Sequence, residues 1–153
     1  MIKENESRKE NGRIDEPLVI GIGASAGGLE ALQQFFGCMP NNSGLSFVVV
    51  QHLSPDYKSL MADILGKHTG MTVLQAVNEM EVEPDTVYLI PPKKYMTIHQ
   101  GKLILSDYAH STLNHPIDIF FSSLAEEKKE HAILGLHMEG PCASELVTVG
   151  TQC

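Results

Sequence analysis

Residues 17–28 read Pro17-Leu-Val-Ile-Gly-Ile-Gly-Ala-Ser-Ala-Gly-Gly28, and they predict a strand, a tight turn and the start of a helix. The apolar, β-branched run over residues 17–22 is typical of a strand that is buried on both faces. The glycine-rich residues 23–28 predict the turn, because neighbours without bulk permit a sharp strand-to-helix reversal. The helix that follows is predicted by apolar residues at helical spacing, namely Leu29, Leu32, Phe35 and Phe36.

The alternation of strand and helix continues along the chain. Apolar runs predict strands over residues 45–50, 72–77, 86–90, 95–99, 102–106 and from 131, and helical spacing predicts helices over residues 60–65 and 117–124. Gln100-Gly101 lies between two of these runs and predicts a β-hairpin. The order β-α-β-α-β, an antiparallel hairpin insert and α-β predicts a three-layer α/β fold, with a mostly parallel sheet flanked by helices.

The chain of 153 residues is long enough for one domain with its own core. We expect residues 1–16, which are almost entirely polar, to be a disordered leader, and residues 17–153 to form the domain. The net charge is −8 and no basic stripe indicates nucleic acid binding. No apolar run approaches the ~20 residues of a membrane span, and the leader lacks the apolar region of a signal peptide. Three scattered cysteines are typical of a reducing cytoplasm.

Ser25 is the candidate nucleophile. It is the central residue of Gly23-Ala24-Ser25-Ala26-Gly27, which fits the nucleophile-elbow pattern G-x-S-x-G in the required context of strand, turn and helix. Such a turn exposes the serine Oγ above the carboxyl edge of the sheet. Backbone N–H groups at the start of the helix, that of Ala26 included, would face an oxyanion formed there, and the helix dipole would add to their effect.

His52 is the candidate base that such a serine needs. It follows the strand over residues 45–50 as Ser25 follows the strand over residues 17–22. If the two strands are neighbours in a parallel sheet, both side chains emerge at the same edge. The alternative is that His52 is a polar residue in a strand-end loop. No pair of histidines has the spacing of zinc ligands within a helix, so we predict no metal site.

The glycine turn also satisfies the dinucleotide fingerprint G-x-G-x-x-G/A, from Gly21 to Ala26. That kind of site needs an acidic residue for the ribose at the end of the second strand. The second strand here ends in Gln51-His52, and the nearest acidic residue is Asp56. A nucleotide-binding α/β module, a purely structural glycine turn and a non-catalytic interaction domain of the same fold stay open as alternatives.

Four segments resemble CheB-type protein-glutamate methylesterases and occur in the same order. They are Val19-Ile-Gly-Ile-Gly-Ala-Ser-Ala-Gly-Gly-Leu-Glu-Ala-Leu32, Phe47-Val-Val-Val-Gln-His-Leu53, Val87-Tyr-Leu-Ile-Pro-Pro92 and His115-Pro-Ile-Asp-Ile-Phe-Phe-Ser-Ser-Leu124. The resemblance spans roughly residues 17–133. It implies a cytoplasmic chemotaxis enzyme that hydrolyses glutamate methyl esters on receptor cytoplasmic domains, often deamidates glutamines there and needs no cofactor. Ser25 matches the family's nucleophile and His52 its base, whereas Ala26 often corresponds to threonine.

Two departures from the family concern the ends of the chain. Regulatory members carry an amino-terminal phospho-receiver domain, whereas the polar residues 1–16 fit a stand-alone esterase or a piece of a methylesterase–methyltransferase hybrid. The family's acid lies in a Gly-x-Gly-x-Asp-Gly loop, and the matching stretch reads Leu134-Gly-Leu-His-Met-Glu-Gly140. Glu139 is the candidate for that acid, and a premature end or a shifted reading frame is the other explanation of the tail. We therefore expect the domain to be incomplete at its C-terminal end and its activity to be impaired.

Overall fold

The computed structural model of the chain describes residues 17–24, 28–51, 58–108, 115–128 and 133–138. The predicted leader and the tail from residue 139 onward lie outside the described residues. The elements are, in chain order, β1 (Leu18–Ala24), α1 (Leu29–Cys38), β2 (Leu45–Gln51), α2 (Lys58–Gly66), β3 (Thr72–Gln75), β4 (Met80–Glu81), β5 (Thr86–Leu89), β6 (Lys94–His99), β7 (Lys102–Asp107), α3 (Pro116–Lys128) and β8 (Ile133–Met138). This is the predicted order of elements with one additional short strand, β4.

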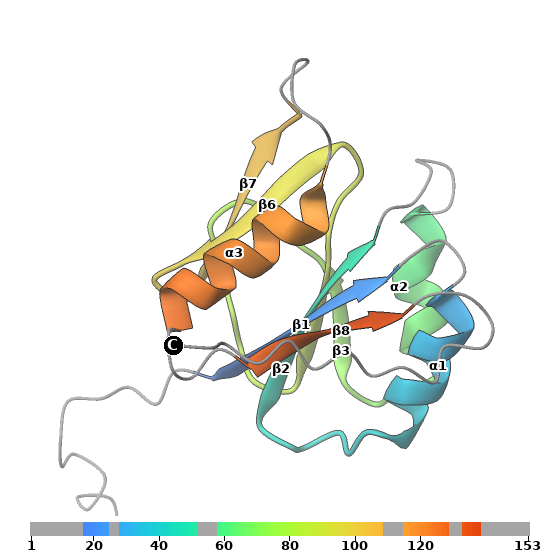
Figure 1. Cartoon of the computed structure of the whole chain (residues 1–153). Coiled ribbons are helices and arrows are strands. Elements are labelled where there is room, and N and C mark those ends of the chain that lie inside the picture. Colours follow the sequence, from blue (N-terminus) through green and yellow to red (C-terminus); the bar gives the residue numbers. More distant parts are fainter. Residues whose placement is uncertain (1–16, 25–27, 52–57, 109–114, 129–132, 139–153) are drawn as a thin grey trace, which may run out of the picture.

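Five strands form a parallel sheet in the order β3-β5-β2-β1-β8 (Figure 1). Strands β1 and β2 pair residue by residue, from Leu18 beside Leu45 to Ala24 beside Gln51. On its other side β1 pairs with β8, and the register shifts between Ile20 and Ile22. The predicted α/β fold with a mostly parallel sheet is confirmed.

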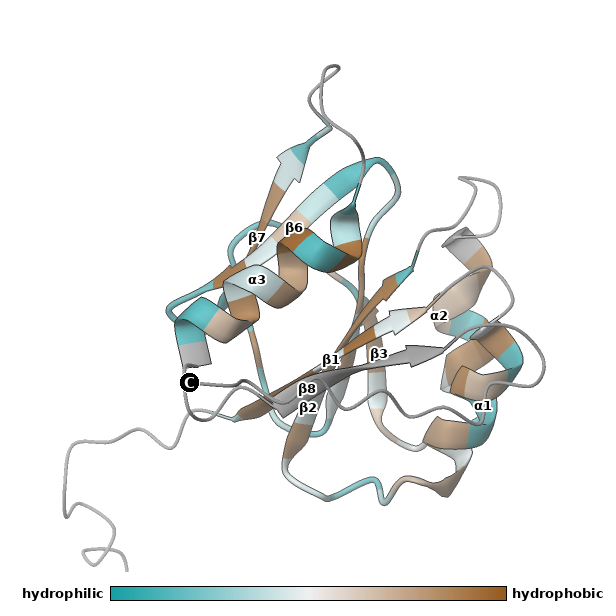
Figure 2. Cartoon of the chain, viewed as in Figure 1, coloured by the Kyte–Doolittle hydropathy of each residue, from teal (hydrophilic) through white to brown (hydrophobic). Residues whose placement is uncertain are grey.

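Helices α1 and α2 cover one face of this sheet (Figure 1). Leu32 and Phe36 lie one turn apart on α1, and both are buried in the core between the helices and the sheet. The ring of Phe36 meets the ring of Phe47 in β2 edge to face, with centroids 5.3 Å apart. The central strands and the inner sides of the helices carry mostly hydrophobic residues (Figure 2). The spacing that predicted α1 is therefore the spacing of its buried face.

The other face of the parallel sheet is covered by α3 and by an antiparallel sheet in the order β4-β7-β6 (Figure 1). Strands β6 and β7 form the predicted hairpin, in which His99 pairs with Lys102. Gln100 and Gly101 have φ values of 49° and 74°, as a two-residue type I′ turn requires. The antiparallel insert is larger than predicted, because β4 pairs with β7. A strand of two residues is too short to show an alternating pattern in sequence.

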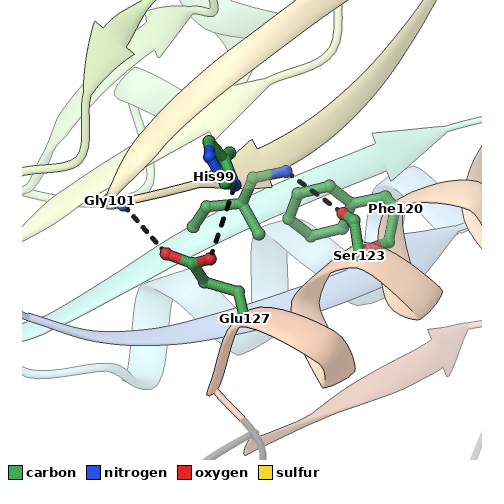
Figure 3. Close-up of polar contacts among 6 residues, drawn as sticks. His99, Gly101, Phe120, Ser123 and Glu127 are labelled. Carbon is green, nitrogen blue, oxygen red and sulfur yellow. Dashed lines mark hydrogen bonds and ion pairs between the residues drawn. The ribbon is translucent and has the colours of Figure 1, made fainter.

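Polar contacts hold α3 against this hairpin (Figure 3). The Oγ atom of Ser123 accepts a hydrogen bond from the backbone N–H of Ile98 at 3.1 Å. Near the end of the helix, Oε1 of Glu127 accepts one from the N–H of Gly101 at 3.2 Å, and Oε2 of Glu127 lies 3.9 Å from Nδ1 of His99. Because these contacts anchor α3 to the hairpin, they also set the position of the helix over the parallel sheet.

Two strands end later than predicted. Strand β1 continues to Ala24, so that Gly23 lies inside the strand and not in the turn. Strand β8 continues to Met138, although the residues after Leu134 show no regular alternation in sequence. Pairing with β1 defines this part of β8, and such pairing is a long-range contact that the local pattern does not contain.

The hydroxyl of Tyr88 in β5 forms hydrogen bonds with the segment that precedes this strand. It accepts a hydrogen bond from the backbone N–H of Glu83 at 2.8 Å and donates one to the carbonyl of Glu81 at 3.2 Å. Burial raises the pKa of Tyr88 above its ordinary value of 10.0. The stability that this group contributes is complete below pH 10, and it is lost as the pH rises through the folded-state pKa, because the unfolded chain ionises first.

We expect Tyr88→Phe to lower the free energy of unfolding by about 1–2 kcal/mol near neutral pH, because the partly buried N–H of Glu83 loses its partner. We also expect the variant to lose less stability than the wild type when the pH is raised above 10, because the raised pKa is removed. Urea unfolding on both sides of that pH measures both effects. Tyr108→Phe is the control, since the Tyr108 hydroxyl makes no hydrogen bond to a described residue; equal losses near neutral pH would contradict the assignment.

Candidate active site

The carboxyl ends of β1, β2 and β8 meet at one edge of the parallel sheet. Ala24, the last residue of β1, pairs with Gln51 on one side and with Met138 on the other, and these are the last residues of β2 and β8. Neighbouring strands lie about 4.8 Å apart, so the three chains reach this edge side by side. The parallel pairing of the strands that precede Ser25 and His52 is thus confirmed.

All four predicted site residues lie outside the described residues; they are Ser25, Ala26, His52 and Glu139. Three of them are the next residues after the paired strand ends: Ser25 follows Ala24, His52 follows Gln51 and Glu139 follows Met138. The structure therefore brings together the residues that precede the candidate nucleophile, base and acid. The roles of the four residues stay predictions.

Side chains of β1 and β2 alternate between the two faces of the sheet. Gly21 and Gly23 of β1 face α3, and Val48 and Val50 of β2 belong to the core on that same side. The register sets Gly21 beside Val48 and Gly23 beside Val50. The alternate residues belong to the core beneath α1 and α2, namely Ile22, Ala24, Phe47 and Val49.

Glycine at two positions of β1 allows α3 to lie close to the strand. A Cβ atom on Gly21 would lie 2.8 Å from Cε1 of Phe121, and one on Gly23 would lie 2.9 Å from Cγ2 of Ile117. Both distances are shorter than Cβ contacts in real proteins, so a Cβ at either position would force side chains of α3 to shift. In the dinucleotide fingerprint the first glycine forms the tight turn after the strand. Gly21 and Gly23 lie within the strand, and their positions do not support the nucleotide-binding alternative.

Helix α1 begins directly after the predicted nucleophile turn. Its N-cap residue is Gly28, with φ −84° and ψ 0°, and no side chain caps the helix there. The first N–H groups of a helix lack partners within the helix, and the helix dipole adds a partial positive charge at this end. An oxyanion that forms at this edge of the sheet would be stabilised by both.

Gln51 is a buried polar residue at the same edge. Its side chain is 5% exposed, and none of the described residues gives its Nε2 atom a hydrogen-bond partner. An unpaired buried donor of this kind costs about 1–3 kcal/mol. The sequence signal is one polar residue at the end of an apolar run, which by itself predicts only a strand end. The sequence pattern therefore did not identify Gln51 as a candidate site residue.

Two tyrosines lie at the open end of the β6–β7 hairpin. The ring centroids of Tyr95 and Tyr108 are 4.5 Å apart, and Lys94 forms an ion pair with Asp107 on the paired strand. Burial raises the pKa of Tyr108 above its ordinary value, and the neighbouring Tyr95 adds to the rise. The chain enters this end of the hairpin from the carboxyl end of β5, through residues 90–93.

The described ranges contain no group of three or more histidine, cysteine, aspartate or glutamate residues that could hold a metal ion. No helix in them is long and apolar enough to cross a membrane.

The fold is a three-layer α/β domain in which the carboxyl ends of β1, β2 and β8 lie side by side. Proteins of this class bind their ligands at the carboxyl edge of the parallel sheet. A family model described as CheB methylesterase matches residues 20–141. The chain therefore belongs to the CheB methylesterase family, as the resemblance in the sequence predicted.

Individual relatives agree with this membership. A protein-glutamate methylesterase/protein-glutamine glutaminase of Desulfitobacterium hafniense is 31% identical over 128 residues, which are 80% of this chain and 32% of that protein. A protein of the same name from Treponema denticola is 29% identical over 138 residues, which are 87% of this chain and 36% of that protein. The chain thus spans about a third of the length of these curated relatives.

A solved structure resembles the described fold. The crystal structure of the Thermotoga maritima CheB methylesterase catalytic domain has a TM-score of 0.67 and 28% sequence identity. The match covers 76% of this chain and 64% of that domain. The likeness extends the family relationship from sequence to the arrangement of the sheet and its helices.

Proposed function

We propose that the chain is a serine hydrolase domain that cleaves glutamate methyl esters in the cytoplasmic domains of chemoreceptors, and deamidates glutamines there. The family membership and the printed names of the relatives support the reaction class. One structural observation carries the proposal: Ala24 and Gln51 are paired strand ends, and the next residues of the two strands are Ser25 and His52.

The alternation of side chains supports a common face for the two groups. Gly23 and Val50 are paired on the face covered by α3, and Ser25 and His52 come two residues later in the sequence, one residue past the end of each strand. One residue of one strand and its paired residue on the next strand share a face of the sheet. If the alternation continues one residue past each strand end, the Ser25 hydroxyl and the His52 imidazole are neighbours on that face, as proton exchange between them requires.

In the proposed reaction, His52 accepts the Ser25 proton while Oγ attacks the carbonyl carbon of the ester. The N–H of Ala26 and the first N–H groups of α1 stabilise the oxyanion of the tetrahedral intermediate. When the intermediate collapses, its bond to the methoxy oxygen breaks, and His52 gives its proton to that oxygen, so that methanol leaves. His52 then removes a proton from water, which attacks the acyl-enzyme and releases a glutamate carboxylate and the free Ser25.

Glu139 is the candidate acid for His52, and it follows Met138, the residue paired with Ala24 on the side away from β2. Because β1 lies between β2 and β8, about 10 Å separates the two outer strand ends, and a carboxylate from β8 must reach past Ser25. In serine proteases, disabling the acid lowers kcat by about 10⁴. We therefore expect this chain to turn over substrate more slowly than family members that have aspartate in the Gly-x-Gly-x-Asp-Gly loop.

A direct assay of methanol release tests the proposed function. We expect the chain to release methanol from a receptor fragment or peptide that carries glutamate methyl esters, at a rate proportional to enzyme concentration. Ser25→Ala protein at the same concentration is the control and should give only the background of spontaneous hydrolysis. Identical methanol release from both proteins, at enzyme concentrations near that of the substrate, would contradict the proposed activity.

A further inference from the structure

Lys93 lies close to the edge of the sheet at which β1, β2 and β8 end. Ile90, which follows β5, donates a hydrogen bond from its backbone N–H to the carbonyl of Val49 in β2 at 3.1 Å. Val49 comes two residues before Gln51, the last residue of β2. Three residues of chain span at most about 11 Å, so the backbone of Lys93 lies within that distance of Ile90.

The contacts of α3 place the open end of the β6–β7 hairpin on the same side. Helix α3 begins over Gly23, one residue before the end of β1, because Ile117 is the nearest neighbour of a Cβ added there. The helix then runs along β6 to Glu127, which accepts a hydrogen bond from Gly101 at the closed end of the hairpin. The open end, where β6 begins at Lys94, therefore lies towards the start of α3 and the carboxyl edge of the sheet (Figure 1).

The backbone of Lys93 has a conformation that lysine rarely adopts. Its φ is 58°, in the left-handed region, where glycine and asparagine are favoured and a longer side chain is strained. Asp85 has a similar φ of 56°, and its short carboxylate accepts a hydrogen bond from the N–H of Gly44 at 2.7 Å. The Lys93 side chain makes no such bond to a described residue, so the described contacts do not explain why this turn carries a lysine.

Lys93 presents an exposed ammonium group that no described residue neutralises. The next residue, Lys94, forms an ion pair with Asp107. At the start of α3, the carboxylate of Asp118 lies 3.9 Å from Nδ1 of His115. The chain as a whole has a net charge of −8, which repels acidic ligands, so a cation at this edge provides attraction where the whole molecule provides none.

We infer that Lys93 is a specificity-determining residue of the proposed hydrolase: its ammonium group binds a substrate carboxylate close to the ester that Ser25 attacks. The preferred substrate is then an acidic peptide. Hydrolysis of one glutamate ester leaves a carboxylate, so a segment with several esters supplies such a group as it is processed. Pro91 and Pro92 restrict the backbone before Lys93, and the ion pair of Lys94 holds the strand after it. This inference rests on the proposed function and deepens it.

The test uses the full chain and two methyl-ester peptides that differ only in the residues flanking the ester, which are glutamate in one peptide and serine in the other. For the acidic peptide in low salt, we expect Lys93→Gln to raise KM about two- to fivefold and Lys93→Glu to raise it about tenfold, while kcat stays within about twofold, because an exposed ion pair strengthens binding modestly. The KM for the serine peptide should not rise in Lys93→Gln. Salt at about 0.5 M should remove the difference between the wild type and Lys93→Gln, because it screens the exposed charges.

Lys67→Gln is the matched control, because it removes the same charge from the protein. Lys67 is exposed and comes between the end of α2 and the start of β3, towards the opposite edge of the sheet. Both KM values should stay at those of the wild type. An unchanged KM of Lys93→Gln for the acidic peptide in low salt, or an equal rise of KM in Lys67→Gln, would overturn the inference.

Failure of the proposed function gives a different result. In that case the wild type hydrolyses neither peptide, and the fluorescence anisotropy of the labelled acidic peptide decides the inference. Salt-sensitive binding that is weakened by Lys93→Gln and unchanged by Lys67→Gln would support an acidic-peptide site at Lys93. Equal binding to all three proteins, or no binding at millimolar protein, would contradict it.

Discussion

Ser25→Ala is expected to abolish labelling of the chain by a fluorophosphonate probe, and His52→Ala is expected to slow that labelling by about 10²–10⁴-fold. The first effect is complete because the alanine side chain has no nucleophile. The second reflects the loss of the base that removes the Ser25 proton, which a serine hydroxyl needs in order to attack at neutral pH. Intact-protein mass spectrometry over time gives both rates, and peptide mapping identifies the labelled residue.

Two exposed residues provide matched controls for this experiment. Ser122→Ala removes an exposed hydroxyl from α3, and His68→Ala removes an exposed imidazole after α2. Both variants should be labelled at the wild-type rate. Labelling that persists in Ser25→Ala, or that is unchanged in His52→Ala, would contradict the assignment of nucleophile and base. All variants should unfold at the wild-type midpoint. A lower unfolding midpoint in Ser25→Ala or His52→Ala would indicate that the residue has a structural role.

Gly21→Val is expected to produce the largest loss of stability, about 3 kcal/mol, at the upper end of the range for overpacked cores. A Cβ at this position would lie 2.8 Å from Cε1 of Phe121, and 3.2 Å from side-chain atoms of both Leu124 and Phe120. Phe120 and Leu124 are buried core residues, and the anchored helix α3 leaves them little room to move. The two γ-methyl groups of valine extend the clash. Urea unfolding at neutral pH measures the loss.

Gly37→Ala is the control for the glycine experiment. Gly37 lies near the end of α1, it is exposed, and the nearest atom to an added Cβ is the carbonyl oxygen of His68 at 3.6 Å. Alanine should raise stability by about 0.5–1 kcal/mol there, because it is the better helix former. If Gly21→Val were as stable as the wild type, the close packing of α3 on β1 would be wrong.

The architecture was predictable because each core element carries its own local pattern. Phe47, Val48, Val49 and Val50 are consecutive and buried, which is what a central strand between two layers requires. Leu32 and Phe36 are one turn apart and buried, as an amphipathic helix requires. The hairpin was predictable from Gln100-Gly101, and both residues have the positive φ that the turn needs.

Contacts between distant segments were not predictable from these patterns. The glycines of β1 fit a turn, a nucleotide fingerprint or close packing equally well, and only α3, about 100 residues further along the chain, distinguishes these roles. For the same reason the sequence did not predict that β8 continues past Leu134. Pairing with β1 defines this part of the strand, and the sequence shows no alternation there. Within the candidate site, the sequence argument assumed that the strands before Ser25 and His52 are neighbours, and the observed register confirms this assumption. The burial of Gln51 emerged only from the fold.

A crystal structure that resolves residues 24–28 and 51–57 would measure the distance between Oγ of Ser25 and the nearer ring nitrogen of His52. With the strands in the register found here, we predict a separation of about 2.6–3.5 Å, a range that allows a hydrogen bond or its formation after a small side-chain rotation. Side chains that point to opposite faces of the sheet, with these atoms too far apart for any rotamer to unite them, would contradict the proposal that the two strands deliver a catalytic pair.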